Sequence, residues 1–386
     1  MTGAWRPSED QTLLLHVALA EPERAMSAWR KWRVRGNPER LDPASARLLP
    51  QVYRKLVSLG LDDSLLPRLR GVHRHTWSAN AVLLAASGPA VEALKGAGIE
   101  SAVVGSAAAW RHYGDSGARA IESLDLLVRP ADVSLVAKVL ESVGWSALRP
   151  MPRDPRLMPE CSAPFAADTR RLSIHWRTSP MCHRPGAVDE ALARSGPATL
   201  GEVRARVLDP TDELLSCAIH AVQARAPFSG PLLSDALTLI RSAGSRLDWN
   251  YLLNSALRDR LVRPLIWSLR WLEQALQAPV PGWVRAALEN TQLPLKERVE
   301  LGLGAVPISL AGRLPHLALH YLRLRQDVPD SVAAGFGTYL QVVWGLRQPW
   351  EIPFYMLRRG VNRVRLWGGR RASADHSSAS GPRIAY

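Results

Sequence analysis

The sequence predicts an α+β fold, in which a small α/β unit lies within a largely helical chain. Three observations lead to this prediction. Apolar residues recur at spacings of three and four through residues 11–90, the periodicity of amphipathic helices. Three strand-like runs with helical segments between them then follow within about 80 residues, as in a small α/β unit. Helical periodicity returns from Pro210 onward.

Residues 1–90 form the predicted N-terminal helical region. Proline and glycine residues punctuate it at the expected helix boundaries. The expected helices are Thr12–Ala20, Pro22–Arg33, Ala44–Leu59 and Leu65–Leu84, with a further short helix at Pro89–Gly98.

Residues 91–208 form the predicted α/β core. Two runs are apolar and β-rich, and a third alternates enough to be a strand. The expected strands are Glu100–Val104, Leu124–Val128 and Arg171–Trp176. The expected helices are Ala107–Tyr113 and Ala131–Val143, with a turn at 114–117 and a loop at 149–160.

Residues 209–369 form the predicted C-terminal helical domain, whose short, Pro- and Gly-separated segments are typical of a helical bundle. The expected helices are Thr211–Arg225, Pro231–Ala243, Asp248–Asp259, Val262–Leu276, Val280–Leu288, Pro294–Leu324 and Val332–Leu346. Residues 370–386 are rich in Ser, Ala and Gly, and we expect them to be disordered.

The chain has 386 residues and a formal net charge of +14, and nearly all of its positive charge is arginine. Such a surface suits nucleic acid or another acidic partner. The other interpretation is an even spread of surface arginine, which the scatter of these residues along the chain favours. Residues 353–371 mix apolar residues with six arginines, a pattern that suits a membrane surface or a last helix packed on the bundle.

The compartment that the sequence predicts is the cytoplasm. No apolar run reaches the length of a membrane helix, and the polar N-terminus does not read as a secretory signal. Cys161, Cys182 and Cys217 form neither a disulfide framework nor a CxxC zinc pattern. The sequence supports no Ser-His-Asp or Cys-His catalytic arrangement, and the pair Cys182-His183 is only a weak metal signal.

Residues 113–130 read YGDSGARAIESLDLLVRP. This block resembles the uncharacterised nucleotidyltransferase family, whose members typically read Y-x-D-x-x-x-R-x-x-x-D-I-D-L-L-V-R-P. Tyr113, Asp115, Arg119 and Asp125 match it in register, and weaker matches extend the resemblance over about residues 10–290. The resemblance implies a small nucleotidyltransferase-like mixed sheet with flanking helices. It also implies a bacterial natural-product or polysaccharide gene cluster as the setting.

Nucleotidyl transfer uses carboxylates, because two Mg²⁺ ions clamp the attacking and leaving oxygens and Mg²⁺ prefers oxygen ligands. The resemblance assigns this role to Asp125. The family's other two carboxylates are Ser123 and Ser173 here, and its lysine is Val104. Glu122 is a second candidate ligand, although an offset of one residue turns it to the other face of a strand unless a bulge restores it.

Four further candidates surround this metal site. Gly105 and Ser106 form a turn whose backbone N–H groups suit phosphate, or which only starts a helix. With Ser123 and Arg119 they make the candidate nucleotide site, although Arg119 also reads as a solvated loop residue. His175 is a catalytic candidate or a half-buried structural histidine.

Other polar residues of the resemblance are expected to be structural. We expect Tyr113 and Asp115 to shape the turn. We expect His220 and Asp235 to make contacts within the helical domain.

Three functional hypotheses follow. The first is an active enzyme that uses Mg²⁺ to transfer a nucleoside monophosphate from an NTP to a small-molecule or peptide acceptor. The second is a degenerate protein that binds a nucleotide or a partner biosynthetic protein and needs no cofactor. The third, which is not favoured, is a basic binder of nucleic acid or of a membrane surface.

Overall fold

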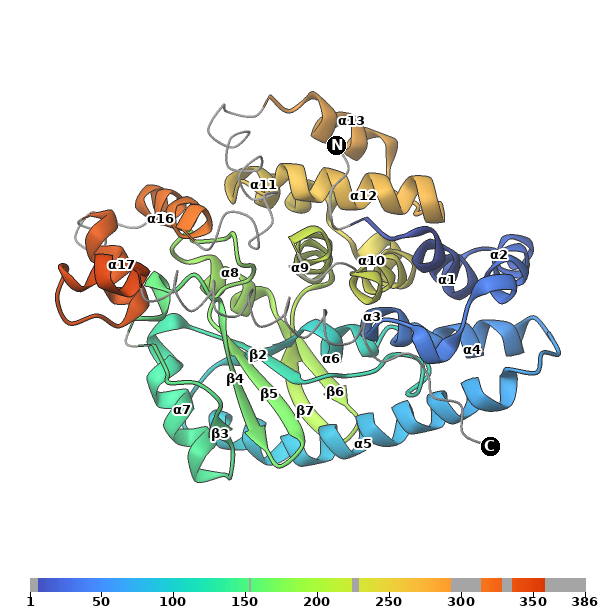
Figure 1. The fold of residues 1–386 in the computed structure, drawn as a ribbon, viewed down its shortest axis with the longest axis horizontal. Coiled ribbons are helices and arrows are strands. Elements are labelled where there is room, and N and C mark those ends of the chain that lie inside the picture. Colours follow the sequence, from blue (N-terminus) through green and yellow to red (C-terminus); the bar gives the residue numbers. More distant parts are fainter. Residues whose placement is uncertain (1–5, 153, 224–228, 293–313, 328–334, 358–386) are drawn as a thin grey trace, which may run out of the picture. The chain divides into compact units, whose positions relative to one another are not determined.

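The computed structural model describes residues 6–152, 154–223, 229–292, 314–327 and 335–357 (Figure 1). The chain divides into two compact units, Met1–Leu319 and His320–Tyr386. The first unit holds the sheet and most of the helices. Within the described ranges, no helix is both long enough and apolar enough to cross a membrane.

A mixed sheet of seven strands forms the α/β part of the first unit, in the order β3-β4-β5-β2-β1-β7-β6. The pairs β1–β7 and β2–β5 are parallel, and the remaining neighbours are antiparallel. This sheet and its helices confirm the predicted α+β class. The strands are β1 (Ser101–Val104), β2 (Leu124–Val128), β3 (Ser146–Ala147), β4 (Ser162–Ala167), β5 (Arg170–His175), β6 (Gly196–Leu200) and β7 (Val203–Val207).

The two faces of the sheet bury different cores, because side chains alternate along each strand. Leu124 and Leu126 of β2 lie in the larger core, which helices α5 (Leu66–Gly96) and α7 (Val133–Ser142) cover. Figure 1 shows α5 crossing this side of the sheet. Leu127 belongs to a smaller core on the other face, under α8 (Ala187–Arg194). Asp125 is two residues from Leu127 and therefore shares this second face.

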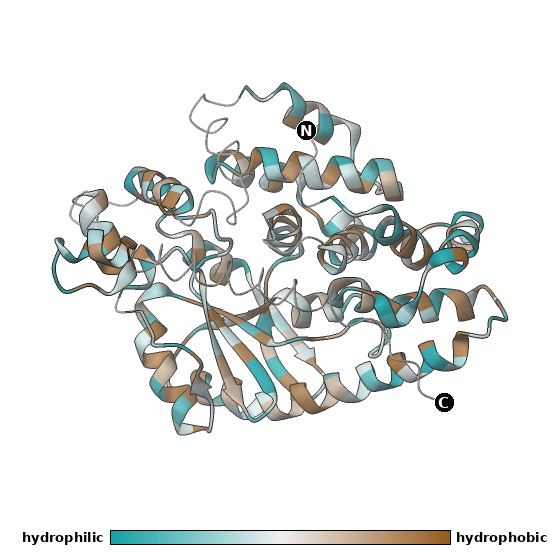
Figure 2. Cartoon of the chain, viewed as in Figure 1, coloured by the Kyte–Doolittle hydropathy of each residue, from teal (hydrophilic) through white to brown (hydrophobic). Residues whose placement is uncertain are grey.

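Helices from both sides of the α/β part in the sequence share one hydrophobic core. Trp29 of α2 and Leu214 of α9 both belong to it. In Figure 2 these helices carry both hydrophobic and hydrophilic residues, as expected of helices with one buried face. They are α1 (Glu9–Leu19), α2 (Pro22–Arg35), α3 (Pro43–Ala46), α4 (Leu49–Ser58), α9 (Pro210–Gln223), α10 (Gly230–Ala243), α11 (Trp249–Arg258), α12 (Val262–Leu276) and α13 (Gly282–Asn290). Helix α6 (Gly105–Trp110) belongs to the sheet core instead, through Ala107 and Ala108.

Local capping explains where two of these helices begin. The hydroxyl of Ser8 accepts from the backbone N–H of Gln11, whose side chain accepts from the N–H of Ser8, a capping box at the start of α1. At the start of α11, the carboxylate of Asp248 accepts from the N–H of Tyr251. The 3₁₀ turns are η1 (Pro38–Arg40), η2 (Pro130–Asp132), η3 (Pro155–Leu157) and η4 (Gly244–Arg246).

Helix α5 runs unbroken over 31 residues, with Pro89 inside it. The predicted division into Leu65–Leu84 and Pro89–Gly98 is therefore wrong. An internal proline removes one helical hydrogen bond and disfavours the helix. Ala90 and Val91, directly after the proline, are buried in the sheet core, and this burial offsets the loss.

The sequence did not predict four of the strands, β3, β4, β6 and β7, nor helix α8. Pro164 in β4 and Pro197 in β6 read as loop signals, since proline cannot donate to a sheet ladder. β6 lies at the edge of the sheet, where a proline is tolerated. β7 reads VRARV and pairs with β1. We did not predict it as a strand because of its two arginines.

The second unit contains α16 (Leu314–Asp327) from His320 onward and α17 (Phe336–Trp344). An aromatic cluster joins these helices. The rings of Tyr321 and Phe336 lie 5.3 Å apart, and the Tyr339 hydroxyl lies 2.7 Å from Nδ1 of His320.

Several predicted segments at this end of the chain lie outside the described residues. They are the helix Pro294–Leu324 up to residue 313, the first residues of Val332–Leu346, the basic segment 353–371 beyond residue 357, and the tail Arg370–Tyr386.

A buried ion pair joins the α/β part to the helical core. Nε and Nη2 of Arg119 each lie 2.8 Å from an oxygen of Asp235 on α10, and both side chains are fully enclosed. The Tyr113 hydroxyl donates to the same carboxylate at 2.7 Å, and the Ser234 hydroxyl donates to Gln51 of α4 at 2.6 Å. The loop that leads into β2 is thereby fixed to α4 and α10.

We expect Asp235→Asn to lower the free energy of unfolding by about 3–5 kcal/mol, because it leaves the guanidinium of Arg119 buried without a counter-charge. Urea unfolding of the full chain measures this. Asp168→Asn is the matched control: Asp168 pairs with Arg170, but its side chain is 79% exposed. A similar loss in both variants would contradict a special role for the buried pair.

Candidate functional site

Asp125 lies on β2 between two neighbouring strands of the sheet. The register places it opposite Val104 on β1 and opposite Ser173 on β5. In adjacent strands, residues that face each other point to the same side of the sheet. Asp125 and Ser173 therefore share one face, and His175, two residues further along β5, joins them there. The strand-borne geometry that the sequence predicted for Asp125 and Ser173 is present.

Three neighbours surround the Asp125 carboxylate. The Ser123 hydroxyl donates to Oδ1 at 2.6 Å, and Nε2 of His175 lies 3.7 Å from the same oxygen. Gly105, at the β1–α6 turn, has a φ of +65°, and a Cβ built on it would lie 2.6 Å from Oδ2 of Asp125. The turn can approach the carboxylate this closely because residue 105 is glycine.

His175 supplies the positive charge of this site. Burial alone would lower the pKa of its imidazole, but the interactions with Asp125 and Cys161 outweigh burial and raise the pKa to about 10. His175 is therefore an imidazolium at neutral pH. It stands beside Asp125 as a counter-ion, in the region where the family resemblance placed a metal.

The residues around Asp125 do not fit a two-metal Mg²⁺ site. Ser123 and Ser173 offer hydroxyls in place of carboxylates, and His175 already neutralises Asp125. Glu122, the other candidate ligand, forms an ion pair with Arg47 at 2.9 Å. Among the described residues, no group of three or more His, Cys, Asp or Glu side chains is placed to hold a metal ion.

Gly105 and Ser106 begin α6, which is six residues long. The Ser106 hydroxyl accepts from the N–H of Glu122 at 3.4 Å, and this contact ties the turn to the residue before Ser123. The candidate residues Gly105, Ser106, Ser123 and Asp125 thus come together at one end of β1 and β2.

Arg119 lies elsewhere. Its side chain is 2% exposed and its guanidinium is bound to Asp235, so the structure gives Arg119 a structural contact and we leave it out of the site. Asp115 accepts from the N–H of Gly117 at 2.8 Å and forms an ion pair with Arg54. Asp115 therefore shapes the turn, as predicted.

The structure brings Cys161 to this site, which the sequence did not predict. Cys161 directly precedes β4, and its carbonyl oxygen accepts from the N–H of Trp176. Burial would raise the pKa of its thiol, but His175 and His220 outweigh burial and lower the pKa to about 5. The sequence analysis supported no Cys-His arrangement and did not connect these residues. Cys161 and His175 are brought together by strand pairing, for which the sequence carries no short-range signal.

His220 on α9 closes the cluster from the helical side. Its Nδ1 lies 2.9 Å from the carbonyl oxygen of Ser216, one helical turn earlier. A carbonyl oxygen can only accept, so Nδ1 carries a proton. This contact lies within α9, in the helical domain where we expected His220 to make its contacts.

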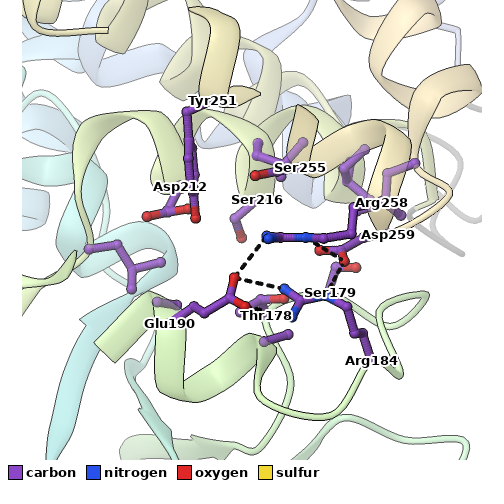
Figure 3. A pocket seen from close by; sticks show the side chains of 16 residues that line it. Thr178, Ser179, Arg184, Glu190, Asp212, Ser216, Tyr251, Ser255, Arg258 and Asp259 are labelled. Carbon is purple, nitrogen blue, oxygen red and sulfur yellow. Dashed lines mark hydrogen bonds and ion pairs between the residues drawn. The ribbon is translucent and has the colours of Figure 1, made fainter. Parts of the chain in front are cut away.

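A small cavity lies between α8, α9 and α11 (Figure 3). It holds about 440 Å³ of space, open mouth included. Glu190 pairs with both Arg184 and Arg258, and Asp259 accepts from Arg184 at 2.6 Å. These four charges form a ring on one wall, as the dashed lines in Figure 3 show.

The polar atoms of this cavity are not all satisfied. The hydroxyls of Ser179 and Ser255 are buried, and neither has a hydrogen-bond partner among the described residues. Ser216 lines the cavity, and its carbonyl oxygen is the partner of His220. The cavity and His220 therefore meet the same turn of α9.

Comparison with known families identifies the class of this protein. The family described as uncharacterised nucleotidyltransferase matches residues 44–277. This match spans more than half of the chain, so the chain belongs to that family. No curated protein matches the chain.

Two solved structures resemble parts of the fold. One is the antibiotic-resistance factor ANT(2'')-Ia in solution, at 12% identity over 48% of this chain and 95% of the other, with a TM-score of 0.35. The other is an antigenic nucleotidyltransferase-like protein from Paracoccidioides brasiliensis, at 18% identity over 55% of this chain and 98% of the other, with a TM-score of 0.35.

We expect Gly105→Ala to destabilise the protein by more than Gly98→Ala. Both glycines have positive φ, so each variant loses roughly 1–2 kcal/mol to backbone strain. Nothing lies within 4 Å of a Cβ at Gly98, whereas a Cβ at Gly105 meets Asp125. Urea unfolding of both variants isolates that clash. Equal losses would show that the turn does not press on the Asp125 carboxylate.

We expect the imidazole of His175 to stay protonated from pH 6 to pH 8, because Asp125 and Cys161 hold its pKa near 10. Stability gained from a raised histidine pKa is complete below the unfolded pKa of about 6.5 and is lost as the pH rises through 10. NMR titration of the ring protons measures this. Asp125→Asn should lower the pKa of His175. An unchanged pKa would show that Asp125 does not stabilise the imidazolium.

Proposed function

We propose that this member of the nucleotidyltransferase family binds a nucleotide without the two-metal chemistry of nucleotidyl transfer. One observation carries the proposal: the Asp125 carboxylate is paired with His175 and Ser123, and no second carboxylate stands on β5 opposite it. The family membership supports a nucleotide as the ligand. The chemistry of the donor set argues against Mg²⁺ as the bridge between nucleotide and protein.

The proposed nucleotide site uses charge that the chain itself supplies. The imidazolium of His175 is the cation closest to Asp125, and it takes the place of a metal ion toward a phosphate group. Ser173 is half-buried on the same face and offers a hydroxyl. The backbone at Gly105 and Ser106 completes a small polar turn that suits phosphate oxygens.

The competing hypothesis is an active transferase that uses Mg²⁺ and Asp125 to move a nucleoside monophosphate to a small-molecule or peptide acceptor. It needs a second acid, and Glu122 is committed to Arg47. The cavity next to α9 offers a space for such an acceptor, but the cations on its wall are already paired.

A basic nucleic-acid or membrane face is the least favoured function. At least fifteen arginines of the described residues form ion pairs with Asp or Glu, and they belong to elements all along the chain. Because these arginines are paired and spread along the chain, they do not gather the net charge of +14 into one cationic face.

Calorimetry with ATP, GTP, CTP and UTP, in Mg²⁺ and in EDTA, tests the proposal. We expect at least one nucleotide to bind, with a Kd that Mg²⁺ changes by less than about tenfold, or 1.4 kcal/mol. Asp125→Ala should tighten binding, because it removes a negative charge near the phosphates and frees His175. His175→Gln should weaken binding, because it removes the cation.

Asp168→Asn is the control, since Asp168 lies on the exposed β4–β5 turn. Pyrophosphate release that requires Mg²⁺ and disappears in Asp125→Asn would overturn the proposal and establish the active transferase. Absence of binding by all four nucleotides would overturn both interpretations.

A further inference from the structure

We propose that the cavity between α8, α9 and α11 binds an uncharged polyol, a small molecule with several alcohol groups such as a sugar or a cyclitol. The proposal rests on two buried hydroxyls in the cavity wall, those of Ser179 and Ser255, and on the balance of charge around them. Figure 3 shows both serines among the polar side chains that line the cavity. The proposal does not depend on nucleotide binding at Asp125.

The hydroxyls of Ser179 and Ser255 have hydrogen-bonding capacity that the chain leaves unused. These residues are only 2% and 3% exposed, and neither hydroxyl has a hydrogen-bond partner within the described part of the chain. Buried polar groups in folded proteins are nearly always hydrogen-bonded, and a hydroxyl both donates and accepts. An alcohol group also does both, so a polyol in the cavity would satisfy the two serines.

The charges on one wall of the cavity already cancel. Nη1 of Arg184 lies 2.7 Å from Oε1 of Glu190, and its Nε lies 2.6 Å from Oδ1 of Asp259. Nη2 of Arg258 lies 2.8 Å from Oε2 of the same Glu190. A charged ligand would have to compete with these pairs, whereas an uncharged ligand leaves them intact. An ionised carboxylate has about four acceptor sites, so Glu190 and Asp259 can also accept from alcohol groups.

The remaining acid of the cavity wall, Asp212 of α9, is also balanced. Nε of Arg194 lies 2.8 Å from Oδ2 of Asp212, and the same guanidinium lies 3.7 Å from the centre of the Tyr251 ring. Burial raises the pKa of the Tyr251 phenol, so its hydroxyl stays protonated and can donate. Figure 3 shows Tyr251 beside Asp212. This wall therefore adds hydrogen-bonding groups without adding an unbalanced charge.

Apolar side chains complete the cavity. Ala187 and Ala191 of α8, Leu215 and Ile219 of α9, and Leu261 belong to the wall. The carbon atoms of a polyol can pack against such side chains while its alcohol groups meet the polar ones, whereas an inorganic ion has no apolar part to place there. Because the mouth is open, a larger polyol can enter with one end.

Saturation-transfer difference NMR of the full chain with glycerol, D-ribose, D-glucose, D-galactose and myo-inositol tests the proposal. We expect at least one of the five to bind. Ser179→Ala and Ser255→Ala should each weaken its binding by roughly two- to tenfold, because each removes one hydrogen bond to the ligand. Amino and phosphate derivatives of that polyol should bind more weakly than the uncharged molecule.

Thermal unfolding without ligand separates this role from a structural one. Ser179→Ala and Ser255→Ala should keep or raise Tm, because each removes a buried polar atom that has no partner among the described residues. Ser234→Ala is the matched control and should lower Tm, since Ser234 is fully buried and its hydroxyl donates to Gln51 at 2.6 Å.

Four outcomes would overturn the proposal. They are the absence of binding by all five polyols, unchanged binding in either serine variant, tighter binding of a charged derivative, and a fall in Tm in either serine variant as large as that of Ser234→Ala. The last outcome would show that the hydroxyl of Ser179 or Ser255 supports the fold and is not held for a ligand.

Discussion

The arrangement of the first unit depends on the ion pair between Arg119 and Asp235. Two fully buried charges are stable only when each satisfies the other, and here both nitrogens of the guanidinium fork meet the carboxylate at 2.8 Å. The pair ties the loop before β2 to α10. A second contact, between Arg111 and Glu213 at 2.6 Å, ties the end of α6 to α9. These contacts join the helical core to the α/β part that carries Asp125.

This constraint explains how a family motif persists when its catalytic carboxylates are replaced. Tyr113, Asp115 and Arg119 all make structural contacts, so the fold requires them whether or not the chain transfers a nucleotide. Ser173, by contrast, lies on β5, whose pairing involves the backbone, and Ser123 directly precedes β2, so a serine at either position leaves the ladder intact. The residues of this block that support the fold therefore differ from those that would carry the activity. Because the resemblance rests mainly on Tyr113, Asp115 and Arg119, it predicts the fold better than the reaction.

The predictable part of the structure is local. β1, β2 and β5 are apolar or alternating runs, and their pairing puts Asp125 opposite Ser173 as the resemblance implied. The sequence did not predict β4, because Pro164 resembles a loop signal. For the same reason it did not predict the position of Cys161, which directly precedes β4. Whether Cys161 meets His175 is decided by the register of two strands, which a short segment does not encode. Likewise, the burial that keeps α5 helical through Pro89 comes from a sheet that forms elsewhere in the chain.

His175 determines which chemistry this site can support. It is an imidazolium that lies beside the Asp125 carboxylate, and both Asp125 and Cys161 raise its pKa. A divalent cation at Asp125 would have to repel or deprotonate this imidazolium. With a pKa near 10, deprotonation at pH 7 costs on the order of 4 kcal/mol, which a lone carboxylate with two serine hydroxyls does not offset. This cost is the physical reason for the proposal that the site meets a phosphate group through the imidazolium of His175 instead of through a metal ion.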